Sequence, residues 1–271
     1  MAGILLFTGK GGVGKSTITA NLAAVLAQTG SRVVIVDADI GLRSQDAILS
    51  LENRVIYDLI DLTSGDCTLS QAVLPCEDVP GLFLLPAAQF ARAKDLKPDH
   101  LSKVLQKLRA SFDYVFVDCP AGIERGLRNV LNAGVDECIL VTVPDDIAVR
   151  STERAFQVVE SKHLARPFLI VNRLDRKLIR SGEMMSAPVI SQVMDLPLLG
   201  EIPDDTAVVR SSLKHALFIF YDCEARCAIQ RIACRLKGGS SPFPSYGCQK
   251  ESFIRRIFAR SMKEVTPIDD L

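Results

Sequence analysis

Short apolar runs alternate with longer amphipathic stretches along most of this chain, and that alternation leaves few folds open. The apolar runs are mostly uninterrupted, and they occupy residues 3–8, 32–37, 82–85, 113–118, 137–143, 167–171 and 198–202. Uninterrupted runs are typical of strands that are covered on both faces. The amphipathic stretches include residues 15–28, 101–111 and 147–162. We therefore predict an α/β fold with a doubly wound, mostly parallel sheet and helices on both faces.

The charges of the chain balance, with 32 Lys and Arg against 32 Asp and Glu over 271 residues. A chain with zero formal charge has no global field that attracts nucleic acid, so we expect nucleic-acid binding to be absent and any electrostatic attraction to be local. No run of eighteen apolar residues and no secretory signal pattern occurs, which predicts a cytoplasmic protein.

The eight cysteines are scattered along the chain. A chain of this length can bury a large core and needs no disulfide to fold, so we expect reduced thiols. The tightest pair is Cys223 and Cys227. We predict buried helix positions for this pair, because no second pair or histidine follows at zinc spacing.

A phosphate-binding loop follows the first apolar run. Residues 9–17 read Gly-Lys-Gly-Gly-Val-Gly-Lys-Ser-Thr, which satisfies G-x-x-x-x-G-K-[ST] between a strand and a helix. Backbone N–H groups of such a loop surround phosphate oxygens, and the helix N-terminus adds partial positive charge. We expect Lys15 to neutralise the β- and γ-phosphates and Ser16 to ligate Mg²⁺. The predicted nucleotide-binding residues here are Gly11, Gly12, Val13, Gly14, Lys15, Ser16 and Thr17.

Carboxylates stand at the ends of two further apolar runs. Asp118 closes the run 113–118, where it can hold Mg²⁺ through a water molecule. Asp37 and Asp39 follow residues 32–36, close enough to the phosphate loop in a βαβ unit to orient a water or the metal. Each could instead belong to a solvated turn, and the phosphate loop is what favours a functional role.

Lys10 makes the loop more specific. The segment from Lys10 to Ser16 resembles the deviant Walker A motif of the ParA/MinD family of P-loop ATPases. Residues 37–43 and 118–124 are similar to that family's two switch segments, and residues 84–87 and 202–205 give further matches. The resemblance implies the P-loop NTPase fold and a slow, partner-stimulated hydrolysis of ATP with Mg²⁺.

The resemblance also implies roles for individual residues. Lys10 would reach across a homodimer to the partner's phosphates, and Lys15 and Asp39 would complete the catalytic set, with Asp39 orienting the attacking water. Asn172 would pair with adenine, alongside the backbone near Pro203. The family members with similar switch segments position the bacterial division site, which implies partners of the MinC and MinE kind and a peripheral location on the inner membrane.

The C-terminal residues have a different composition. Residues 237–249 are rich in Gly, Ser and Pro, which predicts a flexible linker between an ATPase domain, residues 1–236, and a helix over residues 250–263. At 100° per residue that helix would carry apolar and basic side chains on opposite halves, typical of an anchor in anionic lipid. A helix packed on the body or on a partner is the alternative. The predicted membrane residues are Phe253, Ile254, Arg255, Arg256, Ile257 and Phe258.

Three other functions share parts of this pattern. A ParA-type DNA partition ATPase would need a basic surface in place of the lipid tail. An electron-donor ATPase of the nitrogenase iron-protein type would hold a cluster through cysteines, and Cys119 beside Asp118 is the residue that suggests it. A flagellar-placement homologue would share both the ATPase and the tail.

Overall fold

The computed structural model describes residues 3–92, 94–123, 125–162 and 164–244. They form an eight-stranded sheet in the order β3-β4-β2-β5-β1-β6-β7-β8. All neighbouring strands are parallel except β3 and β4. The strands are β1 (Gly3–Gly9), β2 (Val33–Asp37), β3 (Leu74–Pro75), β4 (Leu82–Leu85), β5 (Tyr114–Asp118), β6 (Glu137–Thr142), β7 (Phe168–Leu174) and β8 (Leu198–Pro203).

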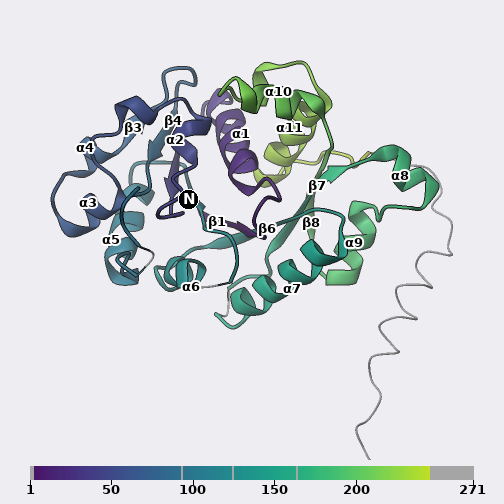
Figure 1. Cartoon of the computed structure of the whole chain (residues 1–271), viewed down its shortest axis with the longest axis horizontal. Helices are drawn as coiled ribbons and strands as arrows, with labels where there is room; N and C mark the ends of the chain where they lie inside the picture. The colour runs from purple at the N-terminus through teal and green to yellow at the C-terminus, as the bar shows by residue number, and fades with distance from the viewer. Residues whose placement is uncertain (1–2, 93, 124, 163, 245–271) are drawn as a thin grey trace, which may run out of the picture.

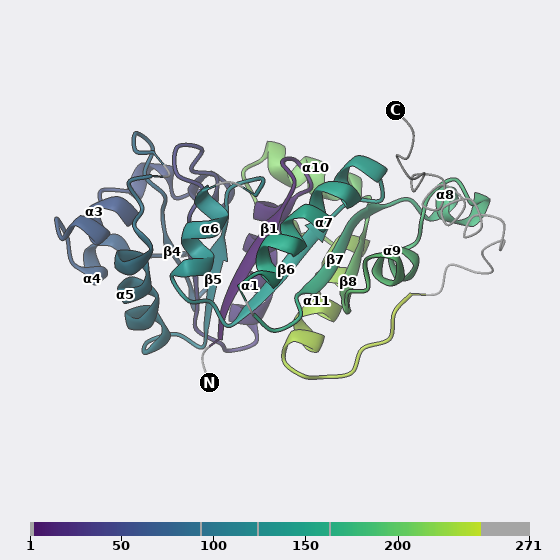
Figure 2. The ribbon, with the colours of Figure 1, turned by 90° about the horizontal axis from the view of Figure 1, so that it is seen from below.

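Helices cover both faces of the sheet, as Figures 1 and 2 show. One face carries α1 and α11, and the other carries α5, α6, α7 and α9. The helices are α1 (Lys15–Gln28), α2 (Gln45–Ile48), α3 (Leu59–Ser64), α4 (Leu69–Ala72), α5 (Pro98–Arg109), α6 (Arg125–Asn132), α7 (Asp146–Glu160), α8 (Arg176–Ser181), α9 (Ala187–Met194), α10 (Thr206–Leu213) and α11 (Glu224–Leu236), with 3₁₀ turns η1 (Glu52–Arg54) and η2 (Phe218–Phe220). The predicted doubly wound α/β fold is confirmed.

Two apolar cores lie on either side of the sheet. In β1, Ile4 and Leu6 join the core under α5, α6, α7 and α9, whereas Leu5 and Phe7 join the core under α1 and α11. Phe7 also meets Phe116 of β5 at 4.8 Å between ring centroids. Burial on both faces explains why the central strands are uninterrupted apolar runs.

The predicted segment boundaries agree with the structure to within a few residues. The seven apolar runs correspond to β1, β2, β4, β5, β6, β7 and β8, and the three stretches predicted as amphipathic helices to α1, α5 and α7. The amphipathic character predicted for α1 is wrong, because this helix is buried on all sides from Ile18 to Ala27 between the sheet and α11. The two-residue strand β3 is an addition, because it is too short to leave a periodic pattern and forms by antiparallel pairing with β4.

The cysteines of the described residues are free thiols. The prediction that Cys223 and Cys227 are buried is wrong for Cys227, which is exposed, while Cys223 is partly exposed. Helix α11 turns Ile229 and Ile232 toward the sheet. Cys227 lies two residues before Ile229, about 200° around the helix, and therefore faces outward.

Part of the segment predicted as a linker is anchored to the body. The Arg235 guanidinium donates hydrogen bonds to the carbonyl oxygens of Leu199 at 2.9 Å, Ser241 at 3.0 Å and Pro242 at 3.0 Å. It also lies over the Phe243 ring, 3.7 Å from the centroid. These contacts hold residues 241–243 of the segment 237–249, which the structure describes as far as residue 244. The division of the chain into domain, linker and tail stays a prediction.

No helix in the described part of the chain is long and apolar enough to span a bilayer. The predicted membrane helix at 250–263 lies outside the described residues.

Candidate nucleotide-binding site

The phosphate loop joins β1 to α1 at the carboxyl edge of the sheet. Gly12 and Gly14 adopt φ of +81° and +92°, a region where L-residues with a Cβ are strained. Gly14 is the N-cap of α1, and no side chain caps that helix. The first N–H groups of α1 therefore remain available to an anion at the loop.

Lys15 and Asp118 form a buried ion pair across the loop. Lys15 Nζ donates to Asp118 Oδ1 and lies 3.3 Å from Ser16 Oγ. Burial by itself lowers the pKa of Lys15, but the carboxylate of Asp118 outweighs that effect, and the pKa is raised from its ordinary value. Lys15 is thus a cation held at the base of the loop, in contact with two of the predicted metal-site residues, Ser16 and Asp118.

Asp37 and Asp118 end neighbouring parallel strands. They are register partners on β2 and β5, so both carboxylates lie at the same edge as the phosphate loop. Asp37 accepts hydrogen bonds from the backbone N–H groups of Asp39 and Gln45, each at 3.0 Å. Complete burial and the nearby charge of Asp118 nevertheless raise the pKa of Asp37 to about 7. A cation bound beside Asp37 would favour its charged form.

Gln45 is a site residue that the sequence analysis missed. Its Nε2 donates to Asp118 Oδ2 at 2.6 Å and to the carbonyl oxygen of Ser16 at 3.1 Å. Its backbone N–H also donates to Asp37. Gln45 therefore contacts Ser16, Asp37 and Asp118, the three predicted metal-site residues. A glutamine after a turn carries no local signal, and the contacts join positions 29 and 73 residues away along the chain.

The residues present fit a nucleotide phosphate with Mg²⁺. A Cβ added at Gly12 would meet nothing within 4 Å, which leaves open space above the loop. The described residues contain no group of three or more His, Cys, Asp or Glu side chains able to hold a metal. Asp118, Asp37 and the Ser16 hydroxyl can supply part of an oxygen shell, and Mg²⁺ commonly takes its remaining ligands from water and substrate phosphates.

Two of the predicted catalytic residues are partly exposed. Asp39 follows β2, and burial raises its pKa, an effect that the charge of Lys15 opposes and that of Asp118 reinforces. Lys10 opens the loop, and its carbonyl oxygen lies 3.5 Å from the N–H nitrogen of Val13. Both side chains thus remain accessible to a water molecule or to a partner surface.

Asn172 and Pro203 lie at the carboxyl edge, on β7 and β8. Asn172 Nδ2 donates to the carbonyl oxygen of Val13 at 2.8 Å. A Cβ at Gly14 would come within 2.5 Å of the same amide nitrogen. Asn172 therefore holds the loop in this structure. Pro203 is buried at the end of β8. Adenine binding by these two positions stays a prediction.

This fold and loop define a P-loop NTPase. The ParA family model, described as "NUBPL iron-transfer P-loop NTPase", matches residues 2–236. The septum site-determining protein MinD of Synechocystis is 39% identical over 260 residues, which cover 95% of this chain and 97% of the relative.

Two solved structures are also similar. The MinC:MinD cell division protein complex of Aquifex aeolicus matches with a TM-score of 0.81 and 32% identity, covering 91% of this chain and 99% of the solved one. The septum site-determining protein MinD of Pyrococcus horikoshii, complexed with Mg-ADP, matches with a TM-score of 0.77 and 29% identity, covering 87% and 96%. The chain belongs to the ParA/MinD family, and within it to the MinD-type septum site-determining ATPases.

Proposed function

We propose that this chain binds ATP with Mg²⁺ at the phosphate loop, dimerises in that state and helps to position the division site from the inner membrane. The observation that carries the proposal is the convergence of Lys15, Asp118 and Asp37 on one loop at the sheet edge. The Mg-ADP complex of the Pyrococcus relative supports the choice of ligand.

The chain's own residues have distinct tasks in this proposal. Lys15 exchanges its ion pair with Asp118 for the β- and γ-phosphates, which leaves the Asp118 carboxylate free to face the metal. Ser16 and Asp37 add oxygen atoms on the same side. Bound Mg²⁺ supplies charge neutralisation for the phosphates. Asp39, at the accessible rim, orients a water molecule toward the γ-phosphate, and hydrolysis is slow until a partner completes the set.

Exposed apolar side chains at the same edge support dimerisation there. Leu42, Phe90 and Ile147 are 71%, 94% and 69% exposed. They follow β2, β4 and β6 in the chain and therefore lie at the carboxyl edge that carries the phosphate loop. Large apolar side chains exposed on one side of a molecule are typical of an interface. A second copy placed against this edge would cover them and bring Lys10 to the partner's nucleotide.

Membrane attachment and partners complete the proposal. Residues 250–263 serve as the lipid anchor, and one copy binds anionic lipid weakly because interfacial burial is partial. Two copies on one dimer bind far more strongly, since the second insertion is intramolecular. The Aquifex complex supports a MinC-like partner. A MinE-like protein would stimulate hydrolysis and release the chain from the membrane.

Sedimentation with vesicles of anionic lipid tests this function. The intact chain should sediment with the vesicles in ATP and Mg²⁺ but stay in the supernatant in ADP. A chain truncated after Leu236 should stay in the supernatant in both. Equal sedimentation of the intact chain in ATP and ADP would refute a nucleotide switch.

A further inference from the structure

Gln45 occupies a central place in the candidate site. Its side chain is fully buried, and its amide nitrogen bridges Asp118 and the backbone of Ser16. The two oxygens of Asp118 thus have different partners, Lys15 on Oδ1 and Gln45 on Oδ2. In the proposed function Lys15 exchanges Asp118 for the phosphates, and the bond from Gln45 would then still hold the second carboxylate oxygen.

Helix α2, which carries Gln45, is too short to hold its own position. It has four residues, and isolated helices of that length are unstable in water. At its start, the backbone N–H of Gln45 donates to Asp37 Oδ2 at the end of β2, at 3.0 Å. Just beyond its end, Ser50 Oγ donates to the carbonyl oxygen of His215 at 2.7 Å. Contacts outside the helix therefore set where the Gln45 amide lies.

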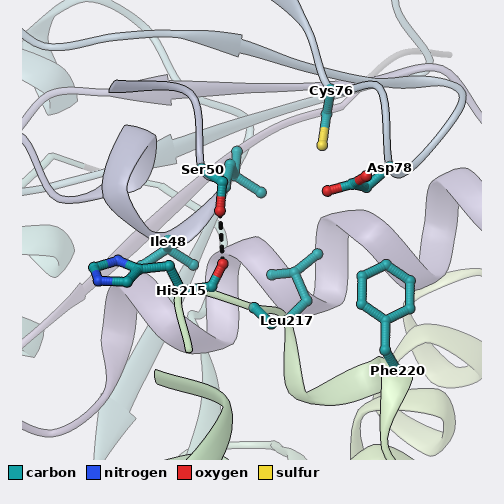
Figure 3. Close-up of a pocket in the computed structure, with 9 residues that line it drawn as sticks. Ile48, Ser50, Cys76, Asp78, His215, Leu217 and Phe220 are labelled. Atoms are coloured by element: carbon teal, nitrogen blue, oxygen red, sulfur yellow. Dashed lines mark hydrogen bonds between the residues drawn. The ribbon is translucent and has the colours of Figure 1, made fainter. Parts of the chain in front are cut away.

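The bond from Ser50 crosses a gap between two segments. Ser50 and His215, both exposed, line a pocket of about 360 Å³. Figure 3 shows the bond between them, with Ile48 on one side and Leu217 on the other. Ser50 and His215 adopt φ of +56° and +49°, a conformation disfavoured for residues other than glycine. We call this exposed hydrogen bond, which joins the end of α2 to the segment after α10, the tether.

We propose that Gln45 is a positioning residue of the ATPase site, which orients the Asp118 carboxylate for Mg²⁺ and is itself held by the tether from Ser50 to His215. This inference rests on the proposed Mg²⁺-dependent nucleotide site. Residues that orient a metal ligand through a hydrogen bond typically change metal affinity about 10-fold to 100-fold when they are replaced. The effect should fall mainly on Mg²⁺, because Gln45 contacts the Ser16 carbonyl and not the backbone N–H groups of the loop or Lys15, which would bind phosphate.

The test is a titration of fluorescent mant-ADP into the full-length chain, in EDTA and at a series of Mg²⁺ concentrations. In Gln45→Met, which keeps the length of the side chain but removes the donor, the Kd in EDTA should stay within about twofold of the wild type. The Mg²⁺ concentration at half of the Mg²⁺-dependent tightening should rise about 10-fold. An unchanged Mg²⁺ midpoint would overturn the inference.

The tether gives a second set of variants. Ser50→Gly relieves the positive φ but removes the donor, and it should raise the Mg²⁺ midpoint about threefold. Ser50→Asn, which tolerates the left-handed region and carries an amide donor, should restore it. His215→Gly keeps the accepting carbonyl and should match the wild type. Equal midpoints in all three would overturn the tether.

Binding of mant-ADP by the wild type distinguishes a failure of the inference about Gln45 from a failure of the proposed function. If the wild type binds mant-ADP more tightly with Mg²⁺ and Gln45→Met behaves identically, only the role of Gln45 fails. If the wild type shows no Mg²⁺-dependent tightening, the proposed function and the inference fail together.

Discussion

Replacing Gly14 by alanine should destabilise the nucleotide-free protein through two separable effects. The backbone at Gly14 has φ of +92°, and an alanine in the left-handed region costs roughly 1–2 kcal/mol. The added Cβ would also lie 2.5 Å from Asn172 Nδ2, whose hydrogen bond to Val13 would have to break at a cost of about 1 kcal/mol. The sum is about 2–3 kcal/mol, or a fall in Tm of about 5–10 °C for a chain of this size.

Gly12→Ala is the matched control, because its φ is +81° but a Cβ there meets nothing within 4 Å. It should lose only the backbone part, so its Tm should exceed that of Gly14→Ala by about 3 °C. In an Asn172→Ala background, Gly14→Ala should fall no further than Gly12→Ala does. The assay is thermal unfolding followed by circular dichroism without nucleotide. Equal losses for the two glycine variants would refute the claim that Asn172 holds the loop.

Three further predictions follow from the site. Lys15→Met leaves the buried Asp118 without its ion-pair partner, so urea unfolding should show a loss of about 3–5 kcal/mol together with lost mant-ADP binding; retention of wild-type stability would argue against the pair. Asp37 has a pKa near 7 when folded and 3.8 as its ordinary value, so the native state binds its proton more tightly, and the free energy of unfolding should fall by about 3 kcal/mol between pH 4 and pH 7. Urea unfolding at each pH should show that fall in the wild type and not in Asp37→Asn. Phe90→Asp should abolish ATP-dependent dimerisation in gel filtration without weakening mant-ADP binding, whereas Phe220→Asp, on η2, should still dimerise.

The sheet and the phosphate loop could be predicted from the sequence because their signals are local. Doubly buried strands leave uninterrupted apolar runs, and the loop needs its glycines, Lys15 and Ser16 at fixed spacing. The strand-end aspartates followed from one rule, that parallel strands direct their carboxyl ends to the same edge. In the structure Asp37 and Asp118 are register partners on neighbouring parallel strands, as that rule predicts.

Other parts of the site depend on contacts that no local pattern encodes. Gln45 reaches Asp118 only because the sheet places β2 beside β5, and the tether from Ser50 joins residues 165 positions apart. The anchoring of residues 241–243 by Arg235 was missed for a similar reason. Composition predicts that a Gly-, Ser- and Pro-rich segment forms no regular structure, but it does not show that one guanidinium will satisfy the segment's carbonyl groups.

The mass of the chain in solution with ATP and Mg²⁺ tests the central claim most directly. Sedimentation velocity should give the mass of two chains for the wild type and of one chain for Lys10→Ala. The wild type and Lys10→Ala should bind mant-ADP with similar affinity. Lys10→Ala that still sediments as a dimer in ATP, or a wild type that remains a single chain at every ATP concentration, would contradict the account.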